Sequence, residues 1–246
     1  MFNENAIDWT SLADEAEYRA AIYRNLSVLF ADAPGGEALA ALVEAARSVS
    51  PGTARRTSED GFYAYLREFG DREFVDPRRA VASEYAELFV GPRPPLAPLY
   101  ESVYLGFPKR LFTDQTMSVR RFYERCGLSV AKDGRVHDDH VAYELELMAA
   151  LVDRETAACN RADLSAASGF WQLEREFVTV HLGGWIGLFA SRIAEAPCAD
   201  FYRALSRFAA SFVSEDDSYL GGLAGMLEHQ HAVAADNDRR TNSVQD

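Results

Sequence analysis

Apolar residues recur at helical spacing along most of this chain, and strand-like alternation is scarce. Near the N-terminus, for example, Ile22, Leu26 and Leu29 fall on one face of an amphipathic helix. Segments with this pattern end at glycine, proline or short polar stretches, which predicts helices over Ala13–Phe30, Glu37–Ser48, Ser58–Phe69, Pro77–Val90, Thr113–Cys126, Asp139–Asn160, Ser168–Ala196, Ala199–Val213 and Gly221–His231. The sequence therefore predicts an all-α protein, a single globular domain of about eight to ten helices.

One central stretch breaks the helical pattern. The run LFVGPRPPLAPLYESVYLG, from Leu88 to Gly106, contains four prolines and two glycines. Because proline fixes φ and lacks a backbone N–H, we expect no helix there. Taken alone, the stretch favours a rigid connector that buries its own leucine and tyrosine side chains.

The composition excludes several classes of partner. A net charge of −13 and a pI near 4.9 argue against binding to nucleic acid or to an anionic membrane surface, since both need basic patches. The three cysteines form no CxxC motif, the N-terminus lacks a basic region followed by an apolar one, and the longest apolar run, Leu182–Ala190, is too short to cross a bilayer. We expect a soluble cytoplasmic protein with no stable membrane insertion.

The chain shows no repeat and no long linker, so we expect one domain over residues 1–246. The turn Lys132–Gly134 could divide it into two lobes, at 1–131 and 135–231, with a flexible tail over 232–246. Such a hinge allows either a monomer or a dimer that exchanges lobes.

Two of the predicted helices carry polar residues on their apolar faces. His140 and Glu144 lie within the apolar arc of the helix Asp139–Asn160, and His181 and Glu174 lie within that of Ser168–Ala196. Burying such groups without partners is costly, so they should form a network or line a cavity. A structural histidine that holds two helices together is the alternative. Asp138 and Asp139 are candidates for the N-cap of the first helix, and Gly183 with Gly184 suggests close approach by another element.

Known catalytic motifs are absent from the sequence, including GxSxG, the P-loop, GxGxxG and HExxH. The cluster His137-Asp138-Asp139-His140, with Glu144 one turn on, is the one candidate metal site. It makes a metal-dependent hydrolase the alternative function; otherwise we expect no metal, no cofactor and no enzymatic activity.

Three segments in this order resemble the TorD/DmsD-type cytoplasmic chaperones, relatives of the NarJ group. They are EYAELFVGPRPPLAPLYESVY (84–104), DDHVAYELELMAAL (138–151) and FVTVHLGGWIGLFASRI (177–193). The resemblance implies an all-helical fold and a non-enzymatic role in molybdoenzyme maturation. Its members bind the twin-arginine leader, and often the body, of a molybdenum-cofactor oxidoreductase, hold the apoenzyme until its cofactor is inserted, and so delay export. The family often has a proline where this chain has His137.

The resemblance also implies the residues of a leader-binding pocket. In this chain they are Leu88, Phe89, the loop from Pro92 to Pro98, Tyr100, Glu101, Ser102, Asp139 and His140. The inward-facing positions and their neighbours add Tyr85, Tyr104, Glu144, His181 and Trp185.

The expected partner explains the residue types. A twin-arginine leader presents guanidinium groups and then an apolar stretch, which call for carboxylates and an apolar groove respectively. Glu101, Asp139 and Glu144 could supply the first, and Leu88, Phe89, Tyr100 and Tyr104 the second. Residues 135–160 include six acids and two bases, a local charge of −4 that would attract the leader.

Overall fold

The computed structural model describes residues 7–73, 75–92, 94–107, 110–130, 136–197 and 199–242, with side chains as far as residue 228. In chain order its helices are α1 (Trp9–Ala31), α2 (Gly36–Ser48), α3 (Thr57–Asp71), α4 (Pro77–Tyr85), the π-helical turn η2 (Ala86–Val90), α5 (Glu101–Leu105), α6 (Asp114–Arg125), α7 (Val141–Cys159), α8 (Leu164–Phe177), the π-helical turn η3 (Val178–Leu182), α9 (Gly183–Ala194) and α10 (Asp200–Asn242). These ranges contain no β-strand, and the predicted all-α fold is confirmed.

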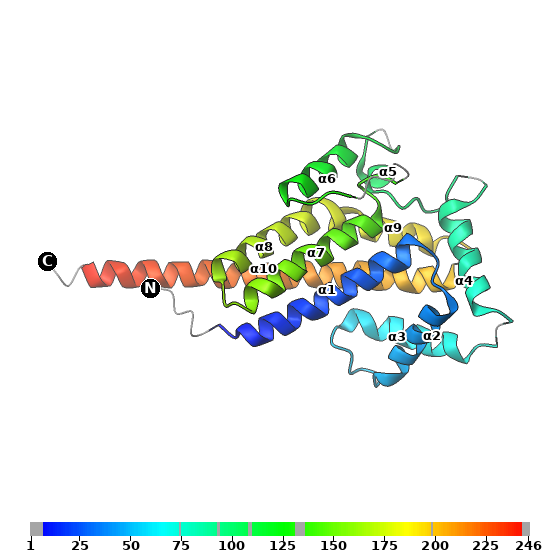
Figure 1. The fold of residues 1–246 in the computed structure, drawn as a ribbon, viewed down its shortest axis with the longest axis horizontal. Coiled ribbons are helices and arrows are strands. Elements are labelled where there is room, and N and C mark those ends of the chain that lie inside the picture. Colours follow the sequence, from blue (N-terminus) through cyan, green and yellow to red (C-terminus); the bar gives the residue numbers. More distant parts are fainter. Residues whose placement is uncertain are drawn as a thin grey trace.

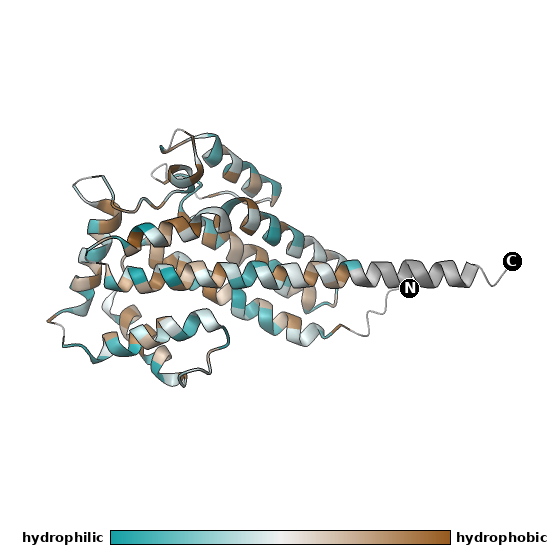
Figure 2. Cartoon of the chain, turned by 180° about the vertical axis from the view of Figure 1, so that it is seen from behind, coloured by the Kyte–Doolittle hydropathy of each residue, from teal (hydrophilic) through white to brown (hydrophobic). Residues whose placement is uncertain are grey.

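The long helices form the body of the molecule. α1 packs along α7, α7 packs on α8, and α10 contacts α9, α3 and α8. The pair α2 and α3 flanks this bundle on one side, and α5 and α6 lie on the opposite side (Figure 1). Seen from behind, α10 crosses the whole bundle and presents hydrophilic residues to the outside (Figure 2).

Side-chain caps explain where several helices begin. The carboxylates of Asp8, Asp76 and Asp163 accept hydrogen bonds from backbone N–H groups in the first turns of α1, α4 and α8. Pro77 occupies the first position of α4, where its missing N–H costs nothing. The predicted starts of most helices therefore agree with the structure to within a few residues.

The two π-helical turns were not predicted. They interrupt the expected helices Pro77–Val90 and Ser168–Ala196, and both carry residues of the predicted pocket. A Cβ on Gly183 would lie 2.6 Å from the carbonyl oxygen of Val178, so only glycine allows the backbone of η3 to close in this way. Turns of this type are frequent at functional sites.

The proline-rich stretch is not free of helix. α5 begins at Glu101, three residues after Pro98, the last proline of the stretch. Its first turn is stabilised because the backbone N–H of Ser102 donates to the carboxylate of Asp139 at 2.9 Å. The prediction of no helix in this stretch was therefore wrong at α5, whereas η2 falls within the predicted helix Pro77–Val90.

The two predicted C-terminal helices are one. α10 continues through residues 214–220, since Asp216 and Leu220 are fully buried and hold this part of the helix against the bundle. The prediction of a break between Val213 and Gly221 was wrong. The backbone remains helical to Asn242, and the flexibility of residues 232–246 stays a prediction.

The two predicted lobes share a core. α1, which belongs to the first, packs along α7, which belongs to the second. The hinge at Lys132–Gly134 lies outside the described residues. The division into lobes and the oligomeric state therefore stay predictions.

Candidate functional site

The three motif segments meet where α5, the start of α7 and α9 come together. An antiparallel bridge pairs Tyr100 with His140, and the N–H of Glu101 donates to the carbonyl of Asp139 at 3.0 Å. The bridge ties the end of the proline-rich loop to the start of α7. η3 and α9 close the site from a third side, and His181 contributes the contact with Glu101.

Asp139 and His140 stabilise two different helix ends. Asp139 is fully buried and caps α5 through Ser102, as described above. His140 is the N-cap of α7, because its Nδ1 accepts the N–H of Ala142 at 3.2 Å. Burial lowers the pKa of His140 to about 4, so the ring is neutral and can accept this bond at neutral pH. The prediction that Asp138 or Asp139 caps α7 was wrong.

Glu101 is fully buried, and the side chains of His181, Gln115 and Glu144 are hydrogen-bonded to it. His181 Nδ1 lies 3.1 and 3.2 Å from its two carboxylate oxygens, and Gln115 Nε2 donates to its Oε1. The sequence placed Glu101 and His181 in one site but missed Gln115. A glutamine in the first turn of an amphipathic helix gives no signal that distinguishes it from a solvated residue.

Glu144 lies deeper, against Trp185. Its Oε2 accepts the indole N–H of Trp185 at 2.9 Å, and both side chains are fully buried. Burial, the adjacent Glu101 and then Asp139 raise the pKa of Glu144 well above its usual range. These interactions therefore favour the protonated form of Glu144.

Several buried polar atoms of this site have no partner among the described residues. They are Ser102 Oγ, Tyr104 OH, Asp139 Oδ1 and Glu144 Oε1. Buried polar atoms of folded proteins are usually paired, so this set can accept and donate bonds to a further group. In the described part of the chain, no lysine or arginine forms an ion pair with Glu101, Asp139 or Glu144.

A second buried carboxylate cluster shows the opposite arrangement. Arg19 of α1 is fully buried, and its guanidinium donates at 2.6 Å to each of Glu155, Glu174 and Asp216. Glu174 therefore belongs to this cluster and not with His181, and Glu155 is not part of an acidic surface. The position of Arg19 within the apolar face of α1 is a signal from which this cluster could have been predicted.

The predicted aromatic residues are mostly part of the core. Leu88 is fully buried, and the Phe89 ring packs against Tyr202 and Tyr85 at centroid distances of 5.0 and 5.1 Å. Tyr104 packs on Trp185 at 5.3 Å. These groups form one layer beside the polar site, joined through a shared neighbour, Phe189.

The residues of the site that solvent can reach lie around the buried carboxyl groups, and we call them the rim. Tyr100 is half-buried, Pro98 is partly exposed and Pro92 is exposed. The rings of Tyr100 and Phe112 lie 5.8 and 5.4 Å from His137, and Phe112 is 52% exposed. Leu105 at the end of α5 is also exposed, as are Phe107 and Leu111 between α5 and α6.

The candidate metal cluster is dispersed. Asp138 pairs with Arg120 at 2.6 Å, His137 lies between two aromatic rings, and Asp139 and His140 cap separate helices. No group of three or more histidine, cysteine or acidic side chains in the described residues is placed to hold a metal ion. This geometry gives no support to the metal-dependent hydrolase.

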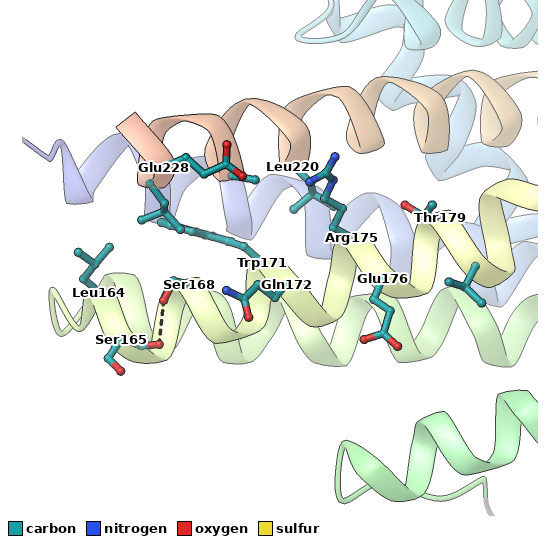
Figure 3. Close-up of a pocket in the computed structure, with 13 residues that line it drawn as sticks. Leu164, Ser165, Ser168, Trp171, Gln172, Arg175, Glu176, Thr179, Leu220 and Glu228 are labelled. Carbon is teal, nitrogen blue, oxygen red and sulfur yellow. Dashed lines mark hydrogen bonds between the residues drawn. The ribbon is translucent and has the colours of Figure 1, made fainter. Parts of the chain in front are cut away.

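A groove of about 790 Å³ runs between α8 and α10, away from this site. Trp171 and Arg175 point from α8 towards α10, whereas Glu176 points away (Figure 3). Trp171 also donates its indole N–H to Glu155 at 2.6 Å, so the floor of the groove is tied to the Arg19 cluster.

One helical stretch of the described chain, Leu164–Ala194, is long and apolar enough to span a membrane by length and composition alone. It comprises α8, η3 and α9. A core helix passes the same test, and the inner face of this stretch packs in the bundle, with Trp171, Phe177 and Trp185 buried.

Comparisons with known proteins agree with this architecture. The model of the nitrate reductase delta subunit family matches residues 32–191. The chaperone protein TorD of Vibrio cholerae serotype O1 (strain ATCC 39315 / El Tor Inaba N16961) is 28% identical over 211 residues, covering 84% of this chain and 94% of that protein. The chlorate reductase assembly chaperone protein of Ideonella dechloratans is 31% identical over 131 residues, covering 52% of this chain and 66% of that protein. The resemblance noted from the motifs is confirmed, and this chain belongs to the nitrate reductase delta subunit family.

Proposed function

We propose that this protein is a cytoplasmic maturation chaperone that binds the twin-arginine leader and the apo form of a molybdenum-cofactor oxidoreductase. It would assist cofactor insertion and delay export, without catalysing a reaction itself. The names of the similar proteins support the general role, since two of them are called a TorD chaperone and a chlorate reductase assembly chaperone.

One observation carries the leader-binding part of the proposal. Glu101, Asp139 and Glu144 form a buried group of carboxyls that has no lysine or arginine partner among the described residues, although His181 lies beside Glu101. Two of their oxygens are unpaired. Buried carboxylates are normally paired with a cation or a metal. A guanidinium from outside the chain would supply both the charge and the missing donors.

The Arg19 cluster indicates what such a site looks like when it is filled. There, one guanidinium satisfies three carboxylates through short hydrogen bonds in the same protein. The candidate site has the same number of carboxyl groups and lacks the arginine. Arginine fits such a site better than lysine does, because its planar fork of donors matches carboxylate geometry.

The rim of the site suits the apolar stretch that follows the arginines. Tyr100, Phe112, Leu111 and Leu105 expose apolar surface on the segments that lead into and out of α5 and into α6. An extended or helical apolar segment could cover this surface on binding. Leu88, Phe89 and Tyr104 would then support the rim from within the core and would not contact the leader directly.

The proposal is tested by calorimetric titration with leader peptides of molybdoenzymes from the same genome, with Lys-Lys versions as controls. We expect binding that needs the arginines and that weakens at least tenfold in Glu101→Gln and Asp139→Asn. Glu146→Gln is the matched control, because Glu146 is an exposed acid on the outer face of α7. Equal loss in all three variants, or no binding of any leader, would contradict the proposal.

A further inference from the structure

We propose that Gln115 occupies the guanidinium position in the free protein, so that α6 carries a built-in competitor that the leader arginine must displace. This inference rests on the proposed function and adds a regulatory contact to the same site.

Gln115 closes the site from the solvent side. Its side-chain amide donates to Oε1 of Glu101, the carboxylate oxygen that also faces His181. Gln115 is partly exposed, whereas Glu101 is fully buried. The amide thus stands between the carboxylate and water and provides one of the donors that a guanidinium would provide.

The backbone around α6 is built to hold Gln115 in this place. Thr113 caps α6, and its Oγ1 accepts the N–H of Gln115 at 3.3 Å. A Cβ on Gly106 would lie 2.9 Å from that Oγ1 and 2.3 Å from the carbonyl oxygen of Ser102. Only glycine therefore allows the start of α6 to pack this closely on α5, which brings Gln115 over Glu101.

The turn that enters α6 is strained. Phe112, directly before the cap, has a φ of 57°, a left-handed conformation that is unfavourable for a residue with a side chain. Its ring is half exposed and rests on His137. Strain of this kind persists only while neighbouring contacts hold it, and it would be relieved if the start of α6 moved away from Glu101.

The exchange favours the leader for a physical reason. Gln115 offers a neutral amide donor, while an arginine brings a positive charge and can form two parallel hydrogen bonds to one carboxylate. Gln115 nevertheless weakens the apparent affinity for the leader. The apparent Kd equals the Kd of the open site divided by the fraction of molecules in which Gln115 has left Glu101.

Three variants test the inference by titration with an Arg-Arg leader peptide and by thermal denaturation. Gln115→Ala removes the competitor, and we expect it to bind the leader about tenfold more tightly, the factor that about 1.4 kcal/mol provides. Gln115→Arg supplies a guanidinium from within the chain, so we expect at least tenfold weaker binding together with a higher Tm. Gln172→Ala, an exposed glutamine of α8, should match the wild type in both measurements.

The outcomes separate this inference from the proposed function. If the wild type binds and Gln115→Ala binds no more tightly, the competitor is refuted and the leader site stands. A Tm for Gln115→Arg that is unchanged or lower would also overturn the inference, independently of any leader. Binding by Gln115→Ala alone would support both, and binding by none of the proteins would refute both.

Discussion

Replacing Arg19 by methionine tests the account of the buried charges most severely. Methionine keeps most of the volume and flexibility of the side chain but removes the guanidinium that bonds to α7, α8 and α10. Glu155, Glu174 and Asp216 would remain fully buried and lose their shared cation.

The structure sets the size of the effect. Removing one partner of a buried ion pair usually costs about 3–5 kcal/mol, because it leaves a charge without compensation. Here three carboxylates lose the same partner, so we expect a loss of at least about 4 kcal/mol in the free energy of unfolding. Total stabilities are about 5–15 kcal/mol, so the variant should be close to unfolding.

The assay is urea denaturation at two pH values, with Arg24→Met as control. Arg24 forms an exposed pair with Asp153, whose loss should cost no more than about 1 kcal/mol. Burial already raises the pKa of Glu174, and removing Arg19 removes an interaction that lowers it. When the pKa of a carboxyl group is raised in the folded state, the stability present at low pH is lost as the pH rises through that pKa. The loss of unfolding free energy in Arg19→Met, relative to wild type, should therefore be smaller at pH 5 than at pH 7.

Arg19→Lys separates loss of charge from failure to fold. Lysine keeps the charge but cannot reproduce the forked contacts, so an intermediate loss is expected. A loss below about 1 kcal/mol in Arg19→Met, or a deficit that grows as the pH falls, would refute the reasoning.

Three further tests address local features of the site. Glu144→Gln should change stability by less than about 0.5 kcal/mol, because burial favours the protonated form of Glu144 and glutamine is a neutral side chain of the same shape. A loss of several kcal/mol in urea denaturation would contradict this reasoning. Gly183→Ala should lower the Tm by several degrees because the added Cβ has no room. Gly187→Ala should raise the Tm, because no atom lies within 4 Å of the added Cβ and alanine favours a helix. Similar shifts for both variants would contradict the role of Gly183 in η3. His140→Ala should lose about 1 kcal/mol through its N-cap while His140→Asn loses less, and equal losses by urea denaturation would argue against the cap.

Local chemistry made much of the fold predictable. Helical periodicity, capping residues and proline positions located the helices, because these signals act within one or two turns of the residue concerned. The inward-facing positions of Glu144 and His181 were also readable, since a polar residue inside an apolar arc must be buried. The two π-helical turns could not be predicted from periodicity, and η3 depends on a single backbone clearance at Gly183.

The partners of the buried groups could not be predicted. The sequence assigned Glu174 to the neighbourhood of His181 from spacing on one helix, but its partner is Arg19, 155 residues away along the chain. The same limit applies to Gln115, whose contact with Glu101 depends on how α6 packs on α5. Periodicity shows which face of a helix is buried and cannot show what lies opposite.

The most direct test of the central claim is a double-mutant cycle between the leader and the protein. Affinities are measured for wild type and Glu101→Gln, each with the Arg-Arg and the Lys-Lys leader peptide. If a guanidinium binds the Glu101 carboxylate, the two changes should be coupled by about 1.5–3 kcal/mol, since the bond involves charged groups. Effects that add to within about 0.5 kcal/mol would mean that the arginines bind elsewhere, and would contradict the account.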